Sequence, residues 1–147
     1  MQRRNFLTSL CGVIATLLVM PLSVLASTWN KAAFETTKLG EAKKNLEIED
    51  EELSQDIQIV LPDVAENGAI VQVEVKSNIS STETISILVE KNPTPLIAHF
   101  KFSNGAEPFV ITRIKMAETS DVKVVVKAGM QYFTNSKNIV VLENGCG

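Results

Sequence analysis

The stretch Val71-Gln72-Val73-Glu74-Val75-Lys76 decides the fold, because its apolar and polar residues alternate with the period of a strand that buries one face. The same alternation, or a short run rich in Val, Ile and Phe, recurs at 57–59, 85–89, 100–102, 110–116, 122–126, 132–133 and 139–142. Turn sequences separate these segments at 66–68, 92–95, 103–105 and 128–129. We therefore predict a mainly β fold of seven or eight strands, an immunoglobulin-like antiparallel β-sandwich over residues 55–142, although the Cys…Trp…Cys signature of antibody domains is absent.

Residues 27–54 follow a different pattern. Apolar residues recur there at helical intervals among Lys and Glu, at Trp29, Ala32, Ala33, Leu39, Ala42 and Leu46. The acidic stretch from Glu47 to Glu52, interrupted only by Ile48, follows them. We predict one amphipathic N-terminal helix and then a solvated acidic linker, with attraction of a basic partner as the alternative for the linker.

The first 26 residues predict a cleaved twin-arginine signal peptide. Arg3 and Arg4 precede an uncharged, mostly apolar run, and small residues suit cleavage between Ala26 and Ser27. Adjacent arginines followed by Asn-Phe-Leu are typical of the twin-arginine export route. We therefore expect the protein in the periplasm.

The alternative for this segment is an uncleaved anchor. Residues 7–26 form a run of 20 uncharged residues, which is long enough to span a bilayer. Pro21, however, would break a helix next to the cleavage site. We expect no stable membrane anchor, and we expect Cys11 to leave with the signal peptide.

The remaining chain would be one acidic domain with a single cysteine. Removal of residues 1–26 from 147 leaves 121 residues, enough to bury one core. Of the 14 basic residues, 12 stay, against 17 acidic residues, which gives a net charge of −5 with His neutral. This charge disfavours nucleic acid as a partner. Cys146 alone cannot form an internal disulfide in an oxidising compartment.

The sequence contains no constellation typical of a catalytic or metal site. His99 is the single histidine and lies among apolar neighbours in a predicted strand, so no second histidine completes a common metal site. HExxH, P-loop and GxGxxG motifs are absent, and the acidic residues are dispersed. We expect no catalytic residue, no metal and no cofactor of the protein's own.

The C-terminal sequence Gly145-Cys146-Gly147 indicates a thiol that is presented to other proteins. Residues 143–147 are predicted to form a flexible arm beyond the last strand, in which Gly145 and Gly147 supply the flexibility. Four extended residues after Leu142 would carry the sulfur up to roughly 13 Å from the sandwich. Glu143 and the terminal carboxylate disfavour a thiolate, and no basic residue lies within the last nine, so we expect activation inside a partner's active site.

Over almost its whole length the chain resembles the SoxY family, the sulfur-carrier subunit of periplasmic thiosulfate oxidation. The twin-arginine start, the Ala33-Phe34 helix, the stretches 61–69 (LPDVAENGA), 85–93 (ISILVEKNP) and 112–116 (TRIKM), and the C-terminal cysteine carry the resemblance. It implies a non-catalytic protein that holds sulfur intermediates covalently on Cys146.

The resemblance also implies the partners and one departure. The partners are the SoxZ subunit in a heterodimer, a haem-containing conjugating enzyme, a metal-dependent hydrolase that releases sulfate, and a sulfur dehydrogenase with molybdenum and haem. The family's usual ending is Gly-Gly-Cys-Gly-Gly. Here Asn144 replaces the first glycine, and no second glycine follows Gly147.

Two other functions use the same cysteine. A periplasmic β-sandwich interaction module would use Cys146 for an interchain disulfide, as an odd cysteine in an exported protein often does. An enzyme with Cys146 as its nucleophile would need a neighbouring base, which the local sequence lacks. A bound, exchangeable sulfur species distinguishes the carrier from the disulfide-linked module.

Overall fold

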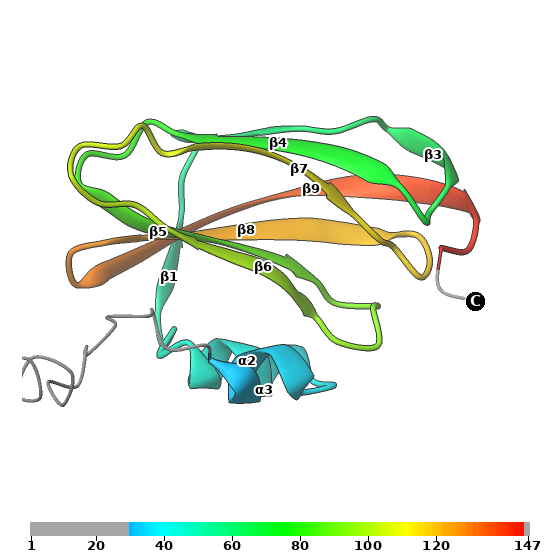
Figure 1. Cartoon of the computed structure of the whole chain (residues 1–147), viewed down its shortest axis with the longest axis horizontal. Coiled ribbons are helices and arrows are strands. Elements are labelled where there is room, and N and C mark those ends of the chain that lie inside the picture. The colour runs from blue at the N-terminus through cyan, green and yellow to red at the C-terminus, as the bar shows by residue number, and fades with distance from the viewer. Residues whose placement is uncertain (1–29, 146–147) are drawn as a thin grey trace, which may run out of the picture.

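The computed structural model describes residues 30–145, which form a β-sandwich with two short helices against one of its sheets (Figure 1). The larger sheet has the strand order β1-β9-β8-β5-β6, and β3 pairs with a further part of β9. The smaller sheet has the order β2-β4-β7. The prediction of a mainly β, antiparallel sandwich is confirmed. The predicted signal peptide lies outside the described residues.

The strands have the following bounds. The larger sheet contains β1 (Glu51–Leu53), β3 (Val64–Asn67), β5 (Thr82–Val89), β6 (Leu96–Lys101), β8 (Ser120–Ala128) and β9 (Gln131–Glu143), and the smaller contains β2 (Ile57–Val60), β4 (Val71–Ser77) and β7 (Phe109–Ile114).

Alternation along the strands produces the main core between the two sheets. In β4 the three valines at 71, 73 and 75 are buried, while Gln72 is exposed. Ile85 and Ile87 of β5 and the valines at 122, 124 and 126 of β8 meet them from the larger sheet. Burial of each such side chain stabilises the fold by about 1.5–3 kcal/mol.

The strand prediction is wrong in detail along one edge. The segments predicted at 132–133 and 139–142 are parts of one 13-residue strand, β9, because the polar residues between them remain paired with β8. At the other edge of β9, β1 runs parallel to residues 132–134 and β3 runs parallel to residues 140–143. These two short strands lack the alternation that marks the others, so the sequence predicted a linker and a turn in their place.

The N-terminal region contains two helices, so the prediction of a single helix is wrong. The helix α2 (Lys31–Glu35) ends at Thr36, whose backbone is extended, and α3 (Leu39–Asn45) begins three residues later. The Thr36 hydroxyl donates to Glu41 at 2.7 Å and accepts from the Lys38 N–H at 3.3 Å. These local hydrogen bonds, with β-branched Thr37 beside them, compete with a continuous helix.

The helices cover the outer face of the larger sheet, below it in Figure 1. Ala33 and Ala42 are fully buried there against Leu88, Leu96 and Val125. This second, smaller core makes the molecule three layers thick. Within residues 30–145, neither helix has the length and apolar character needed to cross a membrane.

Glu51 ties the helices to the sheet, so the acidic stretch is not wholly a solvated linker. Its carboxylate accepts from Lys43 of α3 and lies 3.3 Å from the Lys123 ammonium of β8. Burial acts to raise the pKa of Glu51, but the hydrogen bond from Lys43 and the charge of Lys123 outweigh it and lower this pKa below 4.5. The ionised carboxylate therefore stabilises the packing of α3.

Candidate site at the base of the C-terminal arm

The last strand delivers the chain to a fixed point at one end of the sandwich. The Gly68 N–H donates to the Glu143 carbonyl at 2.8 Å, the Met116 N–H donates to the Gly68 carbonyl at 2.8 Å, and the Gly145 N–H donates to the Met116 carbonyl at 2.9 Å. We call Gly68, Met116, Glu143 and Gly145 the arm base. Figure 1 shows the end of β9 beside β3 at this end of the molecule.

The predicted arm therefore starts later than residue 143. Glu143 is the last residue of β9 and pairs with Asn67 of β3, and Gly145 is hydrogen bonded to the loop that follows β7. Cys146 and Gly147, which the sequence predicts as the sulfur attachment site and a flexible residue, lie outside the described residues. Their roles stay predictions.

Close packing requires glycine at two positions of the arm base. A Cβ atom on Gly145 would overlap the carbonyl of Gly68 and the backbone nitrogen of Ala69. A Cβ atom on Gly68 would overlap the Met116 carbonyl oxygen and lie 2.9 Å from the Gly145 nitrogen. Gly145 thus serves here for close backbone contact, whereas its place in the C-terminal tail predicts flexibility.

Asn144, at a position where the family resemblance implies a glycine, does not take part in this contact. Its side chain is exposed, while the neighbouring Gly145 is half-buried. Position 144, where Asn stands in place of glycine, therefore faces solvent, and Gly145 is the residue that packs against the sandwich. The replacement is compatible with the arm base for this reason.

Asn92 fixes the loop that supplies the Met116 carbonyl. This side chain, 7% exposed in the loop after β5, donates to the Lys115 carbonyl at 2.7 Å and accepts from the Ala117 N–H at 2.8 Å. Its two bonds bracket Met116, whose own side chain is fully buried. Asn92 thereby holds the hydrogen-bond acceptor of Gly145 in place from both sides.

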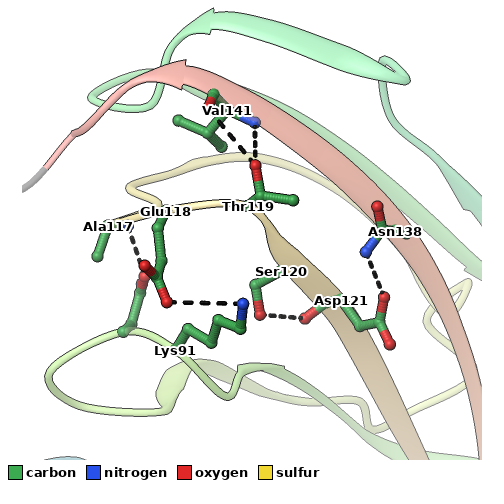
Figure 2. Close-up of polar contacts among 9 residues, drawn as sticks. Lys91, Ala117, Glu118, Thr119, Ser120, Asp121, Asn138 and Val141 are labelled. Carbon is green, nitrogen blue, oxygen red and sulfur yellow. Dashed lines mark hydrogen bonds and ion pairs between the residues drawn. The ribbon is translucent and has the colours of Figure 1, made fainter.

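A second group of polar contacts holds the end of β9 against the same loop (Figure 2). The Thr119 hydroxyl accepts from the Val141 N–H at 2.9 Å, beyond the point where β8 and β9 stop pairing. An exposed ion pair between Lys91 and Glu118, 3.6 Å apart, joins the loops on the surface. The backbone near the arm base is therefore braced on several sides.

The arm base, together with Asn92, which supports it, brings together the three internal stretches that carry the family resemblance. Gly68 belongs to 61–69, Asn92 to 85–93 and Met116 to 112–116. They are far apart in the sequence, and their contacts run mainly through backbone atoms. The sequence predicts turns at Gly68 and at Asn92. The motif LPDVAENGA was the one signal that could have pointed to Gly68.

His99 belongs to a different part of the molecule. It lies on β6, where its Nδ1 atom is 2.9 Å from the Ser86 hydroxyl, and it lines a cavity of about 570 Å³ between the helices and the larger sheet. Burial, followed by the charge of Lys101, lowers the pKa of His99 below 6.5. Among residues 30–145, no group of three or more His, Cys, Asp or Glu side chains is arranged to hold a metal ion.

Solved structures share this fold. A solved structure of the sulfur carrier protein SoxY from Chlorobium limicola f thiosulfatophilum is 34% identical, with a TM-score of 0.65 over 71% of this chain and 96% of that chain. A superoxide reductase (neelaredoxin) from Ignicoccus hospitalis is 18% identical, with a TM-score of 0.52 over 59% of this chain and 80% of that chain. At that identity the likeness concerns the fold alone. A search of curated protein sequences found no match.

The family comparison covers most of the chain. A model of the family described as sulfur oxidation protein SoxY matches residues 43–146, a range that runs from α3 through the whole sandwich to the C-terminal cysteine. It includes every residue of the arm base. The chain therefore belongs to the SoxY family of sulfur oxidation proteins.

Proposed function

We propose that this protein is a sulfur carrier of thiosulfate oxidation, which holds its cargo covalently on Cys146 while partner enzymes carry out the reactions. Membership of the SoxY family and the likeness to the Chlorobium sulfur carrier support the role. The observation that carries the assignment to Cys146 is the arm base, because it places the backbone of Gly145 against the sandwich, one residue before the thiol.

The proposed chemistry begins with oxidative coupling. The sulfur of Cys146 and the outer sulfur of thiosulfate form an S–S bond, the thiol loses its proton, and two electrons pass to a haem-containing partner enzyme. The product is a cysteine S-thiosulfonate. Water then cleaves the bond between the outer sulfur and the sulfonate group, which releases sulfate and two protons and leaves a persulfide on Cys146. A metal-dependent hydrolase would catalyse this second step.

The protein's own contribution is to present the thiol. Glu143, an exposed residue of the arm base, disfavours a thiolate by its negative charge, so activation belongs to the partner's active site. The carrier itself would be non-catalytic and would need no cofactor. A sulfur dehydrogenase would act on the remaining sulfur, SoxZ would form the heterodimer, and export by the twin-arginine route would place the complex in the periplasm.

Intact mass spectrometry tests the proposal. The mature protein is recovered from the periplasm of cells supplied with thiosulfate and is measured with and without reductant, beside the Cys146→Ser variant. A reductant-labile sulfur or thiosulfonate adduct that maps to Cys146 and is missing from the variant is the expected result. Unmodified thiol alone, or a disulfide to another protein alone, would overturn the carrier role, and the disulfide would favour the interaction module.

A further inference from the structure

We infer that the arm base is a seat on which the carrier arm docks, and that Gly68 and Asn92 are positioning residues that control how far Cys146 extends from the sandwich. The inference deepens the proposed carrier function and rests on it. The supporting observation is that Gly68 and Gly145 are in close backbone contact and that both are hydrogen bonded to the backbone of Met116.

The seat determines the reach of the thiol. While the Gly145 N–H is bonded to the Met116 carbonyl, the chain can pivot only beyond Gly145, one residue before the cysteine. If the bond opens, the arm swings from Glu143, and three extended residues allow about 10–11 Å between the Cα atoms of Glu143 and Cys146. Docking therefore separates a short arm from a long one.

The balance between the two states is suited to a reversible device. A single hydrogen bond contributes enough to bias such an equilibrium about 2- to 13-fold. The packing of Gly145 on Gly68 adds contact without any side chain that would have to be withdrawn. The docked arm is thus favoured, yet a partner that binds the extended arm can release it at little cost.

Gly68 acts on this balance from the sandwich side. It is buried, and any Cβ atom there would overlap the Met116 carbonyl oxygen and press on the Gly145 nitrogen at 2.9 Å, the two atoms that form the docking bond. Asn92 acts one step further away, because it holds Lys115 and Ala117 on either side of Met116. Both residues position Gly145, which directly precedes the cysteine in the chain.

The test compares two glycine substitutions in the mature, reduced protein. Gly68→Ala introduces a methyl group into the seat, and Gly40→Ala is the matched control, because nothing lies within 4 Å of a Cβ atom there. Hydrogen exchange at the Gly145 amide and the rate at which a polyethylene-glycol maleimide alkylates Cys146 report the docked fraction. For Gly68→Ala we expect both rates to rise about 3- to 10-fold, and for Gly40→Ala we expect no change.

Wild-type rates in a folded Gly68→Ala variant would overturn the inference. Circular dichroism establishes that the variant is folded. If Gly68→Ala fails to fold, Gly145→Ala is the second variant, because it introduces the same clash from the end of the chain. Hydrogen exchange at the amide of residue 145 that is as slow in this variant as in the wild type would also overturn the inference.

These readouts do not depend on sulfur loading. Raised exchange and alkylation in Gly68→Ala, together with no adduct on Cys146 of the wild-type protein in cells, would support the seat and refute the carrier. Wild-type exchange and alkylation, together with normal adduct formation, would refute the seat and leave the carrier role standing.

Discussion

Replacement of Asn92 by alanine should destabilise the loop that supports the arm. The side chain makes two hydrogen bonds of 2.7 Å and 2.8 Å and is 7% exposed, so its loss leaves the Lys115 carbonyl and the Ala117 N–H without their partner. Each bond contributes about 0.5–1.5 kcal/mol, and each buried group left unpaired costs about 1–3 kcal/mol. Lys115 is exposed and Ala117 half-buried, so we count the two bonds without the full cost of unpaired buried groups and expect a total loss of about 1–3 kcal/mol.

Urea unfolding followed by circular dichroism measures this loss. The slope of the unfolding free energy against urea should stay unchanged, because the folded and unfolded states keep their exposed areas. Lys91→Ala is the matched control from the same loop. It removes only the exposed pair with Glu118, 3.6 Å apart, and such surface pairs contribute about 0–1 kcal/mol.

A second measurement separates a positioning role from a merely structural one. If Asn92 positions the Met116 carbonyl, hydrogen exchange at the Gly145 amide should accelerate in Asn92→Ala under conditions where the protein is still fully folded. A stability loss below about 0.5 kcal/mol would refute the reasoning from the two hydrogen bonds. A full stability loss with unchanged exchange at Gly145 would refute the positioning role.

Three further predictions concern other parts of the molecule. Glu51→Gln should lower stability by about 1–2 kcal/mol at pH 7, since the carboxylate loses its charge toward Lys43 and Lys123. The folded state lowers the pKa of Glu51, so this contribution is present above pH 4.5 and is lost as the pH falls through the folded value. Unfolding curves of both proteins at successively lower pH check it, and a stability difference that grows as the pH falls below 4.5 would contradict it. The folded state also lowers the pKa of His99, so the wild-type protein should lose stability as the pH falls from 6.5 through the folded value. His99→Gln should reduce that loss, and an NMR titration that gives the His99 imidazole a pKa at or above 6.5 would contradict the assignment. Cys146→Ser should leave the unfolding midpoint unchanged, because the residue follows the last strand, and a loss above about 1 kcal/mol in thermal unfolding would count against an arm outside the core.

The sequence predicted those strands whose side chains alternate between a buried and an exposed face. The valines of β4 and β8 are such cases, and periodicity alone identified both strands. Periodicity failed for β1 and β3, which are short edge strands paired along β9. It failed also for the N-terminal helices, because the helical intervals continue across Thr36 while its side-chain hydrogen bonds interrupt the backbone.

The candidate site divides in a similar way. The cysteine, its place in the chain and the family were accessible from the sequence, because they depend on residue type and order. The packing of Gly145 was not, because a glycine in a tail is read as flexible unless the partner that it contacts is known. The partner is Gly68, 77 positions earlier in the chain, in a segment that reads as a turn.

By itself, then, the sequence determined a mainly β chain of the SoxY family with a cysteine near its C-terminal end, since side-chain chemistry and periodicity are written in the order of residues. The tertiary structure alone decided where the arm begins. Three loops bring Gly68, Asn92 and Met116 together, and backbone hydrogen bonds hold Gly145 against them. Every residue type except proline carries the same backbone donor and acceptor, so the choice of hydrogen-bond partners depends on the fold and cannot be read from the residue letters alone.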